Sequence, residues 1–87
     1  MSEVENWTQP TPGTWKKRQP GRGGELELIL RVWEDPTSPM VTWTWEVAEV
    51  SEDDGAEMEV DVGGAESREA AMEAASARAA AYLETGE

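Results

Sequence analysis

The sequence of 87 residues contains no cysteine and no histidine, and these two absences exclude several classes of protein. Without cysteine there is no disulfide framework, no thiolate zinc site and no thiol nucleophile. Without histidine there is no imidazole base and no Ser-His or Cys-His catalytic couple. Basic residues are also scarce, with 7 Lys and Arg against 19 Asp and Glu and a formal net charge of -12. A molecule of this charge repels nucleic acid and anionic lipid.

Long apolar runs are missing as well, since no stretch approaches the roughly 20 residues of a membrane span. The acidic, tryptophan-bearing start does not resemble a signal peptide. The length suits one small domain with a modest core. We therefore expect a soluble protein of the cytoplasm of a bacterial or archaeal host cell, without membrane contact.

The chain divides by composition at residue 24. Residues 1–24 hold three of the five prolines, four glycines and four of the seven bases, and their net charge is +2. Proline and glycine at this density favour extended or irregular chain over helix. We expect this segment to be a basic arm, partly docked or flexible, that supplies at most one short edge strand at 14–18. Residues 25–87, with 17 acids and three bases, form the expected domain.

From residue 25 onward apolar residues recur at every second position, which is the period of a half-buried strand. Turn-forming residues at 34–39 and 52–55 divide this region into three strands. Their expected inward faces are Leu26, Leu28, Leu30 and Val32; then Val41, Trp43, Trp45 and Val47; and then Met58, Val60 and Val62. The pattern predicts a three-stranded antiparallel β-meander.

A helix is predicted to follow, with Ser67 as its N-cap and its end near Leu83. Its alanine-rich body has high intrinsic helix propensity. The expected apolar stripe consists of Ala71 or Met72, Ala75, Ala79 and Leu83, with Tyr82 beside it. A stripe of alanines lets the helix lie close to the sheet, where Trp43 and Trp45 supply the bulk. The expected fold class is therefore α+β, with one C-terminal helix packed across one face of the meander.

Carboxylates are abundant, but their positions do not indicate an active site. A hydrolase needs two acids in a concave, partly desolvated site, and exposed strand or turn acids lack that environment. Asp53 and Asp54 lack the ligand spacing of an EF-hand loop, and the glycines at 21–24 lack the spacing of a phosphate-binding loop. We expect no enzymatic activity, no cofactor and no metal site.

The five tryptophans divide into two groups. Trp43 and Trp45 are expected in the core. For Trp7, Trp15 and Trp33 two interpretations are open: they cover the second face of the sheet, or they are exposed anchors for a protein partner, since tryptophan is enriched at interface hot spots.

A sheet followed by a C-terminal helix, with Gly13-Thr14-Trp15 before the meander and Gly64-Ala65-Glu66-Ser67 before the helix, resembles two nucleic-acid-binding modules. These are the double-stranded RNA-binding domain and the arm-binding domain of phage integrases, which present Lys and Arg to phosphates. In this chain the sign is inverted. The expected outward acids are Glu25, Glu27, Glu46, Glu57, Glu59 and Asp61 on the strands, and Glu52, Asp53 and Asp54 in a turn.

Carboxylates two residues apart on a strand are roughly 6–7 Å from each other. This spacing is comparable to ~7 Å between phosphates, about twice the 3.4 Å rise of one DNA strand. In size, charge and layout the chain is similar to small phage-encoded DNA mimics, including anti-CRISPR and antirestriction proteins. The resemblance implies a non-enzymatic inhibitor that is a phage or prophage protein. Its acidic face would occupy the groove of a basic nucleic-acid-binding protein, such as a CRISPR surveillance complex. We expect a monomer or weak homodimer.

Two other functions remain open. In the first, the chain is a small protein-interaction or accessory domain whose acidity serves only solubility. In the second, Lys16, Lys17 and Arg18 contact single-stranded nucleic acid together with Trp7 and Trp15, through charge and stacking. The acidic remainder of the chain opposes this contact, and pairing with the chain's own acids is a more economical role for these bases. We therefore expect no direct binding of nucleic acid.

Overall fold

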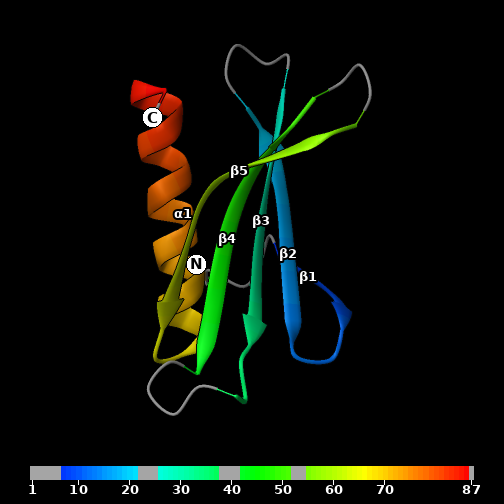
Figure 1. Ribbon diagram of the computed structural model, residues 1–87, viewed down its shortest axis with the longest axis vertical. Coiled ribbons are helices and arrows are strands. Elements are labelled where there is room, and N and C mark those ends of the chain that lie inside the picture. The colour runs from blue at the N-terminus through cyan, green and yellow to red at the C-terminus, as the bar shows by residue number, and fades with distance from the viewer. Residues whose placement is uncertain (1–6, 22–25, 38–41, 52–54, 87) are drawn as a thin grey trace.

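The computed structural model describes residues 7–21, 26–37, 42–51 and 55–86. Five strands form one antiparallel sheet in the order β1-β2-β3-β4-β5, and one helix lies against β3, β4 and β5 (Figure 1). The predicted α+β class and the C-terminal helix are confirmed. The predicted sheet of three strands, with at most one further short edge strand, is too small, because the sheet has five strands. The elements are β1 (Thr8–Thr11), β2 (Thr14–Pro20), β3 (Glu27–Glu34), β4 (Trp43–Val50), β5 (Glu57–Ala65) and α1 (Arg68–Thr85).

The first two strands come from the segment that the composition predicts to be an arm. β2 pairs with β3 along its whole length and with β1 on its other side, so it is not an edge strand. The reversal between β1 and β2 needs a left-handed residue, and Gly13 supplies it with a φ of 81°. Pro10 is tolerated because β1 is the outer strand, where an N–H is not needed for pairing.

The main core lies between α1 and the sheet. The alternating leucines and valines of β3 and β4 are fully buried against Ala71, Ala75 and Ala79, as the alanine stripe predicts. Tyr82 completes this stripe at 5% exposure, whereas Leu83, which was expected there, is 36% exposed. At 100° per residue, position 82 lies nearly in line with position 75, and position 83 is turned away.

Capping residues account for both ends of α1. The Ser67 side chain accepts a hydrogen bond of 3.1 Å from the amide of Ala70, which confirms the predicted N-cap. At the other end Gly86 adopts a φ of 79° and donates its N–H to the Tyr82 carbonyl at 2.7 Å. The helix therefore ends at Thr85, slightly beyond the expected position.

The tryptophans outside β4 do not share one role. Trp7 is only 5% exposed and belongs to the core cluster on the α1 side of the sheet, so neither interpretation made for it holds. Trp15 pairs with Val32 and therefore shares its face; it packs half-buried against the same core, with the Arg68 guanidinium 5.1 Å from its ring centroid. Trp33 alone of the three lies on the opposite face of the sheet. Trp43 and Trp45 pack half-buried against the core, in their expected place.

An irregularity in β5 reverses part of the expected side-chain pattern. Asp61 pairs with Val47 and Glu59 pairs with Ala48, so Val60 has no partner residue on β4. An extra residue of this kind shifts the alternation of side chains by one position. Asp61 consequently lies on the α1 side rather than beside Glu59. Met58 and Val62, expected to be inward, are 57% and 46% exposed.

We predict that Trp7→Ala lowers the free energy of unfolding by about 3–5 kcal/mol, the usual cost of truncating a buried tryptophan. Trp33→Ala, at a half-buried position outside the main core, is the matched variant and should cost clearly less. Urea denaturation followed by far-ultraviolet circular dichroism measures both. Equal losses for the two variants would show that Trp7 adds nothing special to the core.

Candidate functional site

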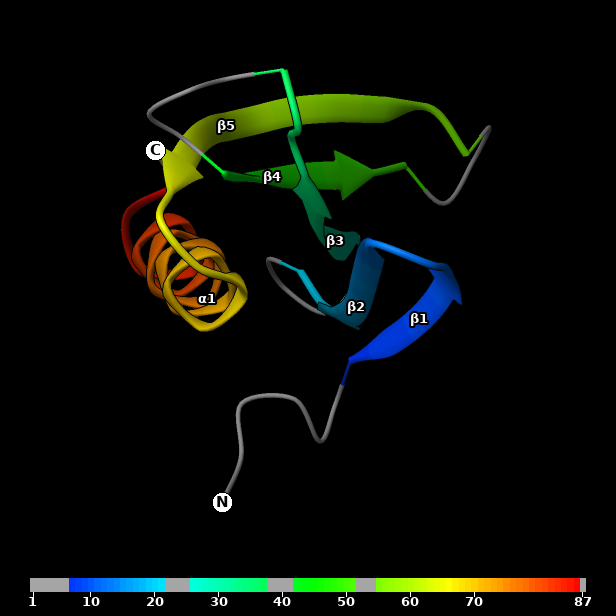
Figure 2. The ribbon, with the colours of Figure 1, turned by 90° about the horizontal axis from the view of Figure 1, so that it is seen from below.

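The face of the sheet opposite α1, which we call the open face, carries most of the sequence-predicted acids that the structure describes. In Figure 2 α1 lies on one side of the twisted sheet and leaves the other side without a covering element. The strand registers place Lys16, Arg31 and Glu46 side by side across β2, β3 and β4. Two basic side chains and one acidic side chain therefore form one row across this face. Its members include Lys16, Arg18, Glu27, Ile29, Arg31, Trp33, Thr44, Glu46, Ala48, Glu57, Glu59 and Val62.

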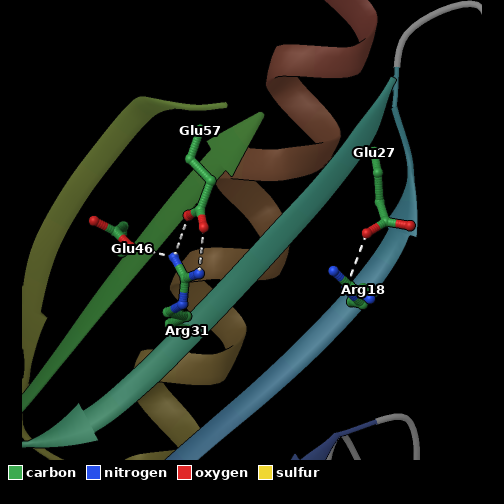
Figure 3. A network of polar contacts seen from close by, with 5 residues as sticks. All are labelled: Arg18, Glu27, Arg31, Glu46 and Glu57. Carbon is green, nitrogen blue, oxygen red and sulfur yellow. Dashed lines mark hydrogen bonds and ion pairs between the residues drawn. The ribbon is translucent and has the colours of Figure 1, made fainter. Parts of the chain in front are cut away.

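Arg31 is the centre of the open face. Its guanidinium donates through Nη1 to Glu46 Oε1 at 3.0 Å and to Glu57 Oε1 at 2.7 Å, and through Nη2 to Glu57 Oε2 at 3.0 Å (Figure 3). One side chain of β3 thus bonds to both β4 and β5. Two parallel bonds to one carboxylate are the strongest geometry available to arginine.

These contacts move the pKa values of both partners in the expected directions. The hydrogen bonds from Arg31 hold the pKa of Glu57 below its ordinary value, with smaller contributions from the charges of Lys16 and Arg18. The bond to Glu57, with a further one to Glu46, raises the pKa of Arg31. Glu57 is therefore ionised at neutral pH, and its negative charge is balanced by Arg31 of the same chain.

Each of the other arginines that the structure describes also contacts a carboxylate of the chain. Arg18 Nε is 2.9 Å from Glu27 Oε1 on the open face (Figure 3). On the α1 side, Arg78 Nε is 2.8 Å from Asp61 Oδ2, and this bond lowers the pKa of Asp61. Near the start of α1, the third pair joins Arg68 Nη2 to Glu69 Oε1 at 2.9 Å. Within the described part of the chain, no arginine is left over for a phosphate.

The structure separates the acids that the sequence placed on one face. Glu27, Glu46 and Glu57 lie there, but each is neutralised in part by arginine. Glu59 is exposed and makes no ion pair with the described residues, whereas Asp61 lies on the other side. Glu25, Glu52, Asp53 and Asp54 lie outside the described residues.

A second acidic surface, on the outer side of α1, was missed by the sequence reasoning. Glu69, Glu73 and Glu84, which we call the helix acids, are all exposed. Spacings of four and eleven residues bring them to the same side of a helix. Glu73 and Glu84 make no ion pair with any residue the structure describes. The spacing of these acids in the sequence already indicates a shared helix face, but the prediction for this helix used only its apolar stripe.

A hollow of about 250 Å³ opens where β4 ends and β5 begins. It is bordered by apolar and acidic side chains, among them Glu49, which is 5% exposed. No group of three acids among the described ranges is arranged to hold a metal ion. The lining residues are Leu26, Glu49, Ser51, Ala56, Glu57 and Met58.

Comparison of the chain with protein-family models, with curated proteins and with solved structures finds no match. In the described residues, α1 is too polar for a membrane-crossing helix. The charges and surfaces of the molecule itself are therefore the guide to its function.

We predict that Glu57→Gln lowers the free energy of unfolding at pH 7 by at most about 1 kcal/mol, because the Glu57 side chain is 42% exposed. The folded-state pKa of Glu57 lies below its unfolded value. Its contribution is therefore present above the ordinary carboxyl pKa and is lost as the pH falls through the folded-state pKa.

The measurement is thermal unfolding of both proteins between pH 7 and pH 3, with Glu59→Gln as the control that removes a carboxylate without breaking an ion pair. The difference between wild type and Glu57→Gln should shrink on acidification. A difference that is constant over this range would contradict the role assigned to the Arg31–Glu57 pair.

Proposed function

We propose that the protein is a non-enzymatic acidic inhibitor that occupies the basic groove of a nucleic-acid-binding protein in place of nucleic acid. The observation that carries this proposal is the unequal use of charge. Every described arginine contacts a carboxylate of the chain, whereas Glu59, Glu73 and Glu84 are exposed acids without an ion pair among the described residues. A CRISPR surveillance complex is one partner of this class.

Long-range electrostatics support the same conclusion. A net charge of -12 on a small domain attracts basic surfaces and accelerates encounter with them, while it repels nucleic acid. The described arginines do little to reverse this preference locally, because each already contacts a carboxylate of the chain. Nucleic acid would have to compete with those carboxylates for the arginines.

The spacing of the acids also fits a partner that binds phosphates. Glu69 and Glu73 are one helical turn apart, about 6 Å along the axis. Glu57 and Glu59, two residues apart on β5, are separated by a similar distance of roughly 6–7 Å. Both values are close to the ~7 Å between phosphates of one strand. In each pair one acid, Glu73 or Glu59, has no ion pair with a described residue, and the other also contacts an arginine of the chain. Helix and sheet hold these acids in place, so little entropy is lost when a partner binds them.

The first experiment identifies the partner. The purified protein is immobilised, incubated at low salt with a lysate of the cells it comes from, and eluted with duplex DNA. We expect the eluted proteins to be basic nucleic-acid-binding proteins, released as well by a moderate increase in salt. Recovery of no such protein at low salt would contradict the proposal.

The second experiment locates the surface with variants that leave the internal ion pairs intact. We predict that the double variant Glu73→Gln and Glu84→Gln lowers affinity for the captured partner at least about tenfold. The double variant Gln9→Lys and Thr11→Lys on β1 changes the net charge by the same amount away from the acids and is the control. Equal losses in the two variants would show that only net charge matters and would contradict a defined acidic surface.

A further inference from the structure

The two edges of the sheet differ in their capacity to accept another strand. β1 has four residues and contains Pro10, which cannot donate a backbone hydrogen bond. β5 has nine residues and no proline, and no described strand lies beyond it. The amide of Val62 donates to the Asp61 side chain at 2.9 Å. An outer strand of this length is a template for pairing with an extended chain.

The side chains of β5 supply apolar contacts on both of its faces. Met58, opposite Glu49, lies on the α1 side, and Val62, opposite Glu46, lies on the open face, because the irregularity at Val60 separates them. Both are exposed large hydrophobic residues, at 57% and 46%. An added strand would place its own alternating side chains against each of them.

The acidic residues of β5 favour a basic partner segment. We propose that the edge of β5 binds a basic, extended segment of the partner protein, which adds to the sheet as a sixth strand. The identity of this partner class rests on the proposed function. Lysine and arginine on the open-face side of an added strand reach the exposed carboxylate of Glu59, while apolar side chains on its other side pack on Met58.

The hollow beside the start of β5 adds room for one long side chain. Its apolar wall comes from Leu26, Ala56 and Met58, and Glu57 lies at its border. A volume of about 250 Å³ accepts a lysine or arginine side chain without rearrangement of the strand.

A second copy of the chain is a poor occupant of the same edge. Pairing the first residues of β5 with the same residues of a second copy would bring Glu57 and Glu59 of one copy against those of the other, and like charges on facing strands are destabilising. Each copy also carries a net charge of -12. Repulsion between acids therefore disfavours pairing of β5 with a second copy of the chain, whereas a basic strand would be attracted to this edge.

The test is a titration of the ¹⁵N-labelled full chain with a nine-residue peptide of alternating lysine and valine, followed by amide shifts and hydrogen exchange. We expect shifts concentrated in β5, new protection of its outward amides, and at least about tenfold weaker binding of the same peptide with alternate backbone nitrogens methylated. Shifts confined to the helix acids, or equal binding of the methylated peptide, would overturn strand addition.

The double variant Met58→Lys and Val62→Lys should lose the peptide, whereas the control variant Gln9→Lys and Thr11→Lys should retain at least half of the wild-type affinity. The captured partner then separates the two proposals. If the Met58→Lys and Val62→Lys variant still binds that partner as tightly as wild type, the β5 inference is wrong and the proposed function stands. If no nucleic-acid-binding protein is captured, the proposed function fails even where the peptide binds.

Discussion

The close packing of an alanine face of α1 against the leucines and valines of β3 and β4 is the contact on which the other features depend. Ala71, Ala75 and Ala79 have little side-chain bulk, so the helix backbone lies near the sheet and a small domain obtains a closed core. Trp7 joins the same core from the first segment of the chain. Because most of this burial lies on one side, the charged residues gather on the opposite face, around the buried Ile29 and Ala48, and on the outer side of the helix.

Charge is distributed over these polar surfaces according to a simple division. The few arginines lie between acids and hold strands and helix together, most clearly where Arg31 bonds to β4 and β5. Exposed acids without an ion pair among the described residues include Glu73 and Glu84 on α1 and Glu59 on β5. The ion pairs on the open face are partly exposed and so add modest stability each, but they remove cations from competition for phosphate. What remains for a partner is an acidic surface presented by rigid elements.

Period-two and helical patterns predicted the elements that depend on one face being buried. β3, β4 and α1 were found in this way, as was the N-cap at Ser67, because burial against a neighbouring layer dictates their periodicity. The contribution of residues 8–20 to the sheet was underestimated, since their propensities are weak and their pairing with β3 is a tertiary effect. The irregularity at Val60 also lacks a local signal, and one extra residue was enough to move Asp61 from the predicted acidic face.

The proposed function is occupation of the groove in which a partner protein binds nucleic acid. Fluorescence anisotropy of a labelled duplex bound to the captured partner tests it most directly, as the acidic protein is added. If the acidic protein displaces the duplex, the anisotropy falls to the value of free duplex. This displacement should weaken steeply between about 50 and 200 mM salt. Anisotropy that stays high while the protein joins a ternary complex with partner and duplex would contradict it.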